Sequence, residues 1–196
     1  MFTGSKPPED PHKLVKFYQI PSGLPDEILD SLCKQCESFE EAMEVSTVKG
    51  NIVDESIRIS KTHWIPTDHW ISGVMAHIVR EANDHLFKFD LTGWSERIQY
   101  TVYDGKGSNH GWHEDCAASN YRENVVRKLS ISLLLSDPED YEGGELQLLS
   151  ARKMTSYRAP KGTAVIFPSP TVHRVRPLKS GIRRSLVGWY GGPGWR

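Results

Sequence analysis

The first half of the chain carries two apolar patterns with the spacing of amphipathic helices. The first begins near Pro25 and comprises Ile28, Leu32, Cys36, Phe39 and Met43. Proline suits the start of a helix, and the acidic pair Asp26 and Glu27 suits the positive end of its dipole. The second begins at Thr67, which suits an N-cap, and comprises Trp70, Val74, Ile78 and Ala82. We therefore expect two helices, each with one buried face.

The remaining pattern is that of short strands. Residues 45–56 predict a strand or loop pair that turns at 49–51, and residues 56–64 alternate like one strand. After Phe87, Gly, Asn, Asp and Pro separate the strand-like runs 97–103, 111–115, 128–135, 144–149, 163–168, 172–177 and 184–191. Within 128–135, alternation predicts one face with Leu129, Ile131, Leu133 and Leu135 and another with Ser130, Ser132 and Leu134. This order predicts an α+β, mainly β fold, with helices packed against a β-sandwich or jelly roll.

Composition favours one globular domain over residues 1–196, in which the proline- and charge-rich segment 1–12 is expected to be loosely held. The chain is 38% hydrophobic, with a formal net charge of -1 and a pI of about 6.7, so nothing favours a nucleic-acid or membrane partner. The N-terminus lacks the apolar core of a signal peptide, no apolar run could span a bilayer, and three cysteines cannot all pair. We therefore expect a cytoplasmic protein. Cys33 and Cys36 are expected to pack within their helix, because no second cysteine pair completes a zinc site.

The segment GWHEDCAAS contains two candidate metal ligands, His113 and Asp115. Composition alone predicts about one His-x-acid pair in such a chain, so the pair by itself is weak evidence. Residues i and i+2 of a strand point the same way, so both side chains can reach one ion. His173, 60 positions later at the start of another predicted strand, is the best candidate for a third ligand. The alternative is that His113 and Asp115 are polar residues that only happen to lie close together.

Two imidazoles and one carboxylate form the facial triad that suits non-haem Fe(II), and they leave coordination positions open for a bidentate co-substrate and O₂. Arg183 stands ten positions after His173, across a turn at Gly181. A guanidinium there can bind the far carboxylate of a dicarboxylate through two parallel hydrogen bonds. Arg184 is expected to face the other side of its strand. The alternative is that both arginines lie on a solvated strand.

Three stretches carry a family pattern when taken in order. They are GWHED, KLSISLLLSDPEDYEGGELQL and GTAVIFPSPTVHRVRPLKSGIRRSLVGWYG. Together they make residues 97–191 resemble the core of the Fe(II)- and 2-oxoglutarate-dependent oxygenases, nearest to the prolyl 4-hydroxylases and the bacterial PKHD-type hydroxylases. The resemblance implies a double-stranded β-helix, that is a jelly roll, with iron at its mouth. The resemblance implies that His113, Asp115 and His173 are the iron ligands. It also implies that Arg183 anchors the distal carboxylate of 2-oxoglutarate.

The resemblance also assigns residues to the co-substrate pocket. Tyr103 matches a tyrosine that hydrogen-bonds the distal carboxylate in prolyl hydroxylases, and Ser132 matches a small hydroxyl residue that lines the pocket. The alternatives are a core tyrosine and an ordinary strand serine. Leu134 stands where some animal prolyl hydroxylases have a second pocket tyrosine, so that contact is missing here.

The activity implied by the resemblance uses Fe(II), 2-oxoglutarate and O₂, with ascorbate as the reductant. It hydroxylates an unactivated C–H bond and yields succinate and CO₂ as co-products. Asp115 favours hydroxylation, because a halogenase lacks this carboxylate and leaves room for halide. The nearest branch implies a prolyl residue of a peptide or protein as the target. A free amino acid or another small molecule is the alternative.

The pattern marks substrate contacts less clearly. Trp112 and Glu114 flank the ligands and are expected to point away from the iron. Loops 104–111 and 116–127 border the expected mouth of the site and can close over a substrate. The candidate substrate contacts are Arg122, Arg127, Arg58, Lys61 and Trp64. For each of them, a solvated surface residue is the alternative.

Two further function classes share parts of the pattern. Nucleic-acid demethylases of the same superfamily carry Arg-x5-Arg after the distal histidine, whereas Trp189 stands six positions after Arg183. A non-catalytic jelly-roll module would use a metal only to order a ligand or a loop. Such a module has no need for open iron positions together with a dicarboxylate clamp. The sequence leaves the oligomeric state open.

Overall fold

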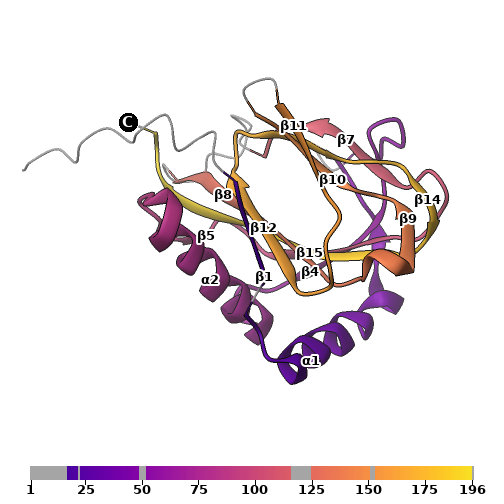
Figure 1. Ribbon diagram of the computed structural model, residues 1–196, viewed down its shortest axis with the longest axis horizontal. Helices are drawn as coiled ribbons and strands as arrows, with labels where there is room; N and C mark the ends of the chain where they lie inside the picture. The colour runs from indigo at the N-terminus through magenta and orange to yellow at the C-terminus, as the bar shows by residue number, and fades with distance from the viewer. Residues whose placement is uncertain (1–16, 22, 49–51, 116–124, 151–152, 196) are drawn as a thin grey trace, which may run out of the picture.

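The computed structural model describes residues 17–21, 23–48, 52–115, 125–150 and 153–195, which form a β-sandwich (Figure 1). The larger sheet has the order β1 (Tyr18–Pro21), β12 (Thr163–Pro168), β8 (Val125–Leu134), β15 (Arg183–Pro193), β6 (Ile98–Tyr103), β4 (Lys61–Ile65) and β2 (Glu44–Val45), and β5 (Gly93–Trp94) pairs with β15. The smaller sheet has the order β11 (Lys153–Tyr157), β10 (Leu146–Ser150), β13 (Val172–Val175), β7 (Asn109–His113) and β3 (Arg58–Ile59). A ribbon pairs β14 (Leu178–Gly181) with β9 (Tyr141–Gly143), which follows the 3-10 turn η5 (Pro138–Asp140).

Both helices pack against the outer face of the larger sheet, away from the smaller one (Figure 1). They are α1 (Asp26–Glu37) and α2 (Trp70–Ala82). Their buried residues form one core cluster with the apolar face of β8, namely Leu29, Leu32, Cys36, Ile71, Met75, Ile78, Val79 and Ala82 with Leu129, Ile131, Leu133 and Leu135. The predicted mainly β fold with N-terminal helices against a jelly roll is therefore confirmed.

β8 has the two faces that alternation predicts. Its leucine and isoleucine face lies under the helices, as the core cluster shows. Ser130 and Ser132 face the interior of the sandwich, where Ser130 bonds to Asp115 and Ser132 lines a cavity. One strand thus connects the hydrophobic core to the polar interior.

α1 is shorter than its apolar pattern predicts. It starts after Pro25, whose carbonyl accepts hydrogen bonds from the backbone of Ile28 and Leu29, and it ends at Glu37. A 3-10 turn, η2 (Glu40–Ala42), follows. Phe39 and Met43 therefore lie beyond the helix, although both still pack against the core. Leu32 and Cys36 of the predicted stripe are buried, whereas Ile28 at its start is 41% exposed and the neighbouring Leu29 is buried in its place.

The predicted N-cap of α2 at Thr67 is wrong. The helix starts after His69, whose Nδ1 accepts a hydrogen bond from the Ile71 amide at 3.3 Å and so caps the first turn. Ile78 and Ala82 of the predicted stripe are buried, whereas Trp70 is 43% exposed and the neighbouring Ile71 is buried. The helix continues directly into a π-helical turn, η3 (Asn83–Phe87).

The run 56–64 is two strands and not one. β3 belongs to the smaller sheet and β4 to the larger sheet, with Ser60 between them. The Ser60 hydroxyl lies 2.7 Å from the Ser46 hydroxyl, and this contact fixes the corner where the chain crosses between sheets. Arg58 and Trp64 therefore project from different sheets. The predicted pair over 45–56 is present as β2 and a Val48–Ile52 bridge, and its turn at 49–51 lies outside the described residues.

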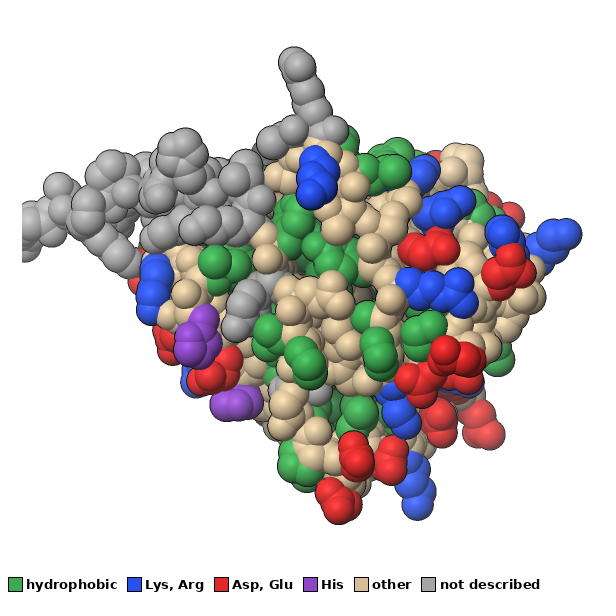
Figure 2. Space-filling model, in the orientation of Figure 1, with side chains coloured by type: hydrophobic (Ala, Val, Ile, Leu, Met, Phe, Trp, Pro, Cys, Tyr) green, Lys and Arg blue, Asp and Glu red, His purple; other side chains and the backbone are tan. Residues whose placement is uncertain are grey.

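The surface agrees with the balanced composition. In the view of Figure 2, acidic and basic side chains lie next to one another and do not form separate regions. Within the described ranges, no helix has the length and apolar character needed to cross a bilayer. The predicted loose segment 1–12, most of loop 116–127 and Arg122 lie outside the described residues.

Candidate metal centre

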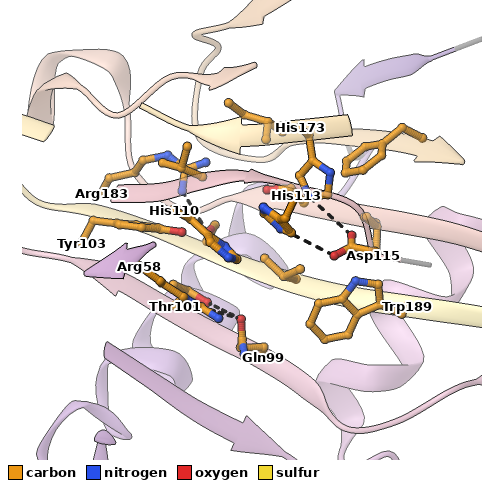
Figure 3. A pocket seen from close by; sticks show the side chains of 17 residues that line it. Arg58, Gln99, Thr101, Tyr103, His110, His113, Asp115, His173, Arg183 and Trp189 are labelled. Atoms are coloured by element: carbon orange, nitrogen blue, oxygen red, sulfur yellow. Dashed lines mark hydrogen bonds and ion pairs between the residues drawn. The ribbon is translucent and has the colours of Figure 1, made fainter. Parts of the chain in front are cut away.

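Three side chains converge at one end of the space between the two sheets (Figure 3). His113 on β7 and His173 on β13 are direct cross-strand partners, and their ring centroids are 4.1 Å apart. Asp115 Oδ1 lies 3.7 Å from His113 Nε2, and Asp115 Oδ2 lies 3.5 Å from His173 Nε2. The three ligand atoms all lie within 4.8 Å of one another, a spacing at which one metal ion can contact all three.

Asp115 reaches this position in a different way from the one predicted. β7 ends at His113, so strand alternation does not aim the carboxylate. The Asp115 amide instead donates to the Ser169 carbonyl at 3.0 Å, which ties the residue to the segment between β12 and β13. The sequence was therefore right about the pair of residues and wrong about the strand that was expected to hold both.

Hydrogen bonds orient both imidazoles toward Asp115. Nδ1 of His113 lies 2.8 Å from the Gly111 carbonyl, and Nδ1 of His173 lies 2.8 Å from the Thr171 carbonyl. Because a carbonyl can only accept, each Nδ1 carries a proton, and each Nε2 is the ring nitrogen turned toward Asp115. Burial and the neighbouring His173 lower the pKa of His113 to about 4, so this ring is neutral at pH 7.

The carboxylate of Asp115 is buried yet ionised. Burial by itself would raise its pKa, but His173, His113 and Arg127 outweigh burial and lower the pKa below its usual value. Ser130 donates a 2.7 Å hydrogen bond to Oδ2. Two imidazoles and one carboxylate are the donor set that Fe(II) takes in a facial triad, so these residues fit the predicted metal.

Arg183 lies at the other end of the same cavity (Figure 3). It is 1% exposed, at the start of β15. Its Nη1 donates to Ser185 Oγ at 3.1 Å, while its Nε and Nη2 have no hydrogen-bond partner among the described residues. A buried cation with two unpaired donors is costly unless an anion binds to it. This arrangement fits the far carboxylate of a dicarboxylate co-substrate.

Other predicted residues line the same cavity. Tyr103 and Ser132 face it and are 3% and 6% exposed. The Arg183 guanidinium carbon lies 5.4 Å from the centre of the Tyr103 ring. Arg184 points to the opposite side of β15, as predicted, and pairs with Glu40 at 2.7 Å.

The candidate substrate contacts occupy different places. Arg58 lines the cavity. Trp64 is 37% exposed and lies 6.2 Å from Trp189, ring centre to ring centre. Lys61 is exposed and pairs with Asp104 at 2.6 Å. Trp112 is 43% exposed, as expected for a residue that points away from the site.

Arg127 is held at the edge of the metal centre. Its guanidinium pairs with Glu96, donates to the Asp115 carbonyl at 3.1 Å and lies 4.2 Å from the centre of the Trp189 ring. These contacts occupy the side chain that the sequence offered as a grip on the substrate. Its local role is to brace Asp115 and Trp189.

Sequence reasoning missed several residues of the cavity wall. These are Gln99, Thr101 and His110, together with Ser185, Val187 and Trp189. Strand periodicity could have found most of them, because 99 and 101 share a face with Tyr103, and 185, 187 and 189 share a face with Arg183. His110 had no such signal. Its ring stacks on His113 with centroids 3.7 Å apart.

Comparison with known proteins agrees with this geometry. Residues 98–191 match the family model described as the 2OG-Fe(II) oxygenase superfamily. Over 177 residues the chain is 42% identical to a PKHD-type hydroxylase of Picosynechococcus sp. The matched region covers 88% of this chain and 77% of the relative. The chain therefore belongs to the 2OG-Fe(II) oxygenase superfamily, and its relatives there are the PKHD-type hydroxylases.

Another relative matches over a shorter stretch of sequence. The similar solved structures are evidence for the fold alone. A PKHD-type hydroxylase of Synechococcus sp. is 40% identical over 84 residues, so the chain spans only 38% of that relative's length. A prolyl hydroxylase of Trichoplax adhaerens in complex with a hypoxia inducible factor peptide fragment superposes with a TM-score of 0.74 at 20% identity, covering 90% of this chain and 83% of that one. A prolyl-4-hydroxylase of Pseudomonas putida gives 0.70 at 23% identity, covering 91% and 93%.

Proposed function

We propose that this protein is an Fe(II)- and 2-oxoglutarate-dependent dioxygenase that hydroxylates a prolyl residue of a peptide or protein. One observation carries the co-substrate assignment. The cavity that holds the His113, Asp115 and His173 cluster also holds Arg183, a buried guanidinium whose Nε and Nη2 are unpaired among the described residues. A plain metal-binding module has no use for such a cation.

His113, Asp115 and His173 are the residues that would hold Fe(II). When bound, Fe(II) and 2-oxoglutarate supply the oxidation, in which O₂ is consumed, succinate and CO₂ are released, and one oxygen atom enters a C–H bond. The chain turns both Nε2 atoms toward the metal position through the Nδ1 hydrogen bonds to Gly111 and Thr171. Ascorbate serves as the reductant that keeps the iron ferrous.

The chain's part in co-substrate binding is to supply charge and hydrogen bonds. Arg183 binds the distal carboxylate through Nε and Nη2, which form two parallel hydrogen bonds. Ser185 holds the guanidinium in place through Nη1 at 3.1 Å. Tyr103 and Ser132 offer hydroxyl groups on the cavity wall beside it.

A structural neighbour, a prolyl hydroxylase solved in complex with a peptide fragment, supports a peptidyl target. Trp189 lines the cavity and Trp64 lies beside it, which gives the entrance an aromatic wall. Aromatic rings of this kind suit contact with the compact, apolar ring of proline.

The test is succinate formation from 2-oxoglutarate in air, with Fe(II) and ascorbate. We expect succinate from the wild-type protein and none from the His113→Ala variant, because the variant loses an iron ligand. Proline-rich peptides and free amino acids are then compared as prime substrates, and mass spectrometry detects the added oxygen. Absence of succinate with every substrate, together with no anaerobic binding of 2-oxoglutarate to the metal-loaded protein, would contradict the proposal.

A further inference from the structure

Arg58 is a second arginine in the cavity, and it reaches across from one sheet to the other. It lies on β3 of the smaller sheet, opposite His110 on β7. Its Nη2 donates at 2.8 Å to Gln99 Oε1 on β6 of the larger sheet, and its Nε donates at 2.9 Å to Ser60 Oγ. The side chain is 6% exposed and lines the cavity (Figure 3).

Arg58 makes no ion pair among the described residues, and both of its hydrogen-bond acceptors there are neutral. The Asp115 carboxylate acts on it only through space. Two other partly buried arginines, Arg184 and Arg127, pair with Glu40 and Glu96. Burial of an unpaired charge costs free energy, and the same burial lowers the pKa of Arg58. An anion that binds beside Arg58 would remove this cost.

The neighbours of Arg58 present donors to the cavity as well. Gln99 Oε1 accepts hydrogen bonds from both Arg58 and Thr101, the latter at 3.2 Å. These two bonds fix the amide group so that its Nε2 points away from them. Neither Gln99 Nε2 nor Arg58 Nη1 has a hydrogen bond to any described residue. Both remain available to a ligand in the cavity that Arg58, Gln99 and Thr101 line together.

The co-substrate does not account for this charge. Fe²⁺, Asp115, the 2-oxoglutarate dianion and Arg183 together carry no net charge. Arg58 therefore adds a positive charge that the loaded site leaves uncompensated. Resting on the proposed function, we propose that Arg58, Gln99 and Thr101 form an anion subsite that binds a carboxylate of the prime substrate. Three kinds of molecule can supply this carboxylate. They are a peptide with an acidic side chain beside the target residue, a peptide with a free C-terminus, and a free amino acid.

Calorimetry with matched acid and amide probes tests this subsite. The protein is loaded with Mn(II) and 2-oxoglutarate, so that binding is measured without turnover. The probe pairs are a proline peptide with Asp or Asn beside the proline, a peptide ending in proline with a free or amidated C-terminus, and L-proline or L-prolinamide. In the pair that matches the natural source, we expect the acid to bind about 10-fold or more tightly than the amide, as a charged hydrogen bond predicts. Equal binding within every pair, or no binding of any acid, overturns the subsite.

Variants separate recognition from folding. Arg58→Gln should abolish the preference for the acid while the dissociation constant for 2-oxoglutarate stays unchanged. Gln99→Glu keeps Arg58 but places a carboxylate beside it, so the fold is retained and the acid preference should also be lost. Arg97→Gln, an exposed arginine just before β6, is the matched control and should keep the preference. If Gln99→Glu keeps the preference, the charge of Arg58 is not the recognition element. Succinate formation, measured in parallel, reports on the proposed function separately.

Discussion

The Ser130 hydroxyl donates a 2.7 Å hydrogen bond to Oδ2 of Asp115, the same oxygen that lies 3.5 Å from His173 Nε2. Ser130 lies on β8, whereas Asp115 follows β7 in the other sheet. The hydrogen bond therefore joins the two sheets at the metal centre. It also fixes the rotation of a carboxylate that strand geometry does not aim.

Ser130→Ala is expected to lower the affinity for a divalent metal by about 10-fold, the usual effect of removing a hydrogen bond to a metal ligand. Calorimetric titration with Mn(II) measures this directly. Ser132→Ala, two positions along the same face, is the control, because Ser132 contacts the co-substrate pocket and not Asp115. Equal metal affinity in the Ser130→Ala variant and the wild type would show that Asp115 needs no such support.

Arg183→Gln is expected to weaken 2-oxoglutarate binding by about 100-fold or more, since a buried, charged, two-point contact is lost. Metal affinity should stay within about threefold of the wild type, because Arg183 lies at the far end of the cavity from the triad. The visible band of the anaerobic Fe(II) and 2-oxoglutarate complex gives the dissociation constant. An unchanged constant would remove Arg183 from the co-substrate site.

Glu40 ties the turn after α1 to the larger sheet. Burial would raise its pKa, but hydrogen bonds from Arg184 at 2.7 Å and Tyr100 at 2.8 Å outweigh burial and lower the pKa below 4.5. A lowered acid pKa adds stability above pH 4.5 that is lost as the pH falls through the folded-state value. Glu40→Gln should therefore cost about 1 kcal/mol near neutral pH, discounted for partial exposure.

The pH dependence of urea unfolding checks this contribution. The difference between the wild type and Glu40→Gln should shrink as the pH falls below 4.5, because the unfolded chain takes up a proton first and the folded chain does so at lower pH. Glu41→Gln, an exposed neighbour in the same turn, should show no such difference. A difference that persists unchanged in acid would mean that packing and not charge makes the contribution of Glu40.

The faces of single strands could be predicted from the sequence because each is a local property. Alternation along β8 separated the face of Leu129, Ile131 and Leu133 from the face of Ser130 and Ser132. In the structure the first face packs against the helices and the second faces the interior. Likewise, Arg183 follows His173 by only ten positions. The chain between them turns back at one tight corner, so both side chains reach the same cavity.

Pairing between distant segments could not be predicted in this way. The contact of Arg58 with Gln99 spans 41 positions and joins two sheets, and no local sequence pattern around either residue predicts it. The break of 56–64 into two strands depends on Ser46, which lies 14 positions before Ser60. The cap of α2 was missed because histidine is not a usual N-cap residue.

Gly181 shapes the corner that places Arg183. Its φ is +80°, and a Cβ there would lie 2.0 Å from the Asp140 carbonyl oxygen. Gly181→Ala should therefore destabilise the protein by about 2–4 kcal/mol, through both backbone strain and the clash. Gly23→Ala is the control, because its φ is +68° but no atom lies within 4 Å of its Cβ position, so strain alone should cost about 1 kcal/mol. Urea unfolding of both variants measures the difference. Equal losses would show that the corner yields at Asp140 and that the close approach does not fix the position of Arg183.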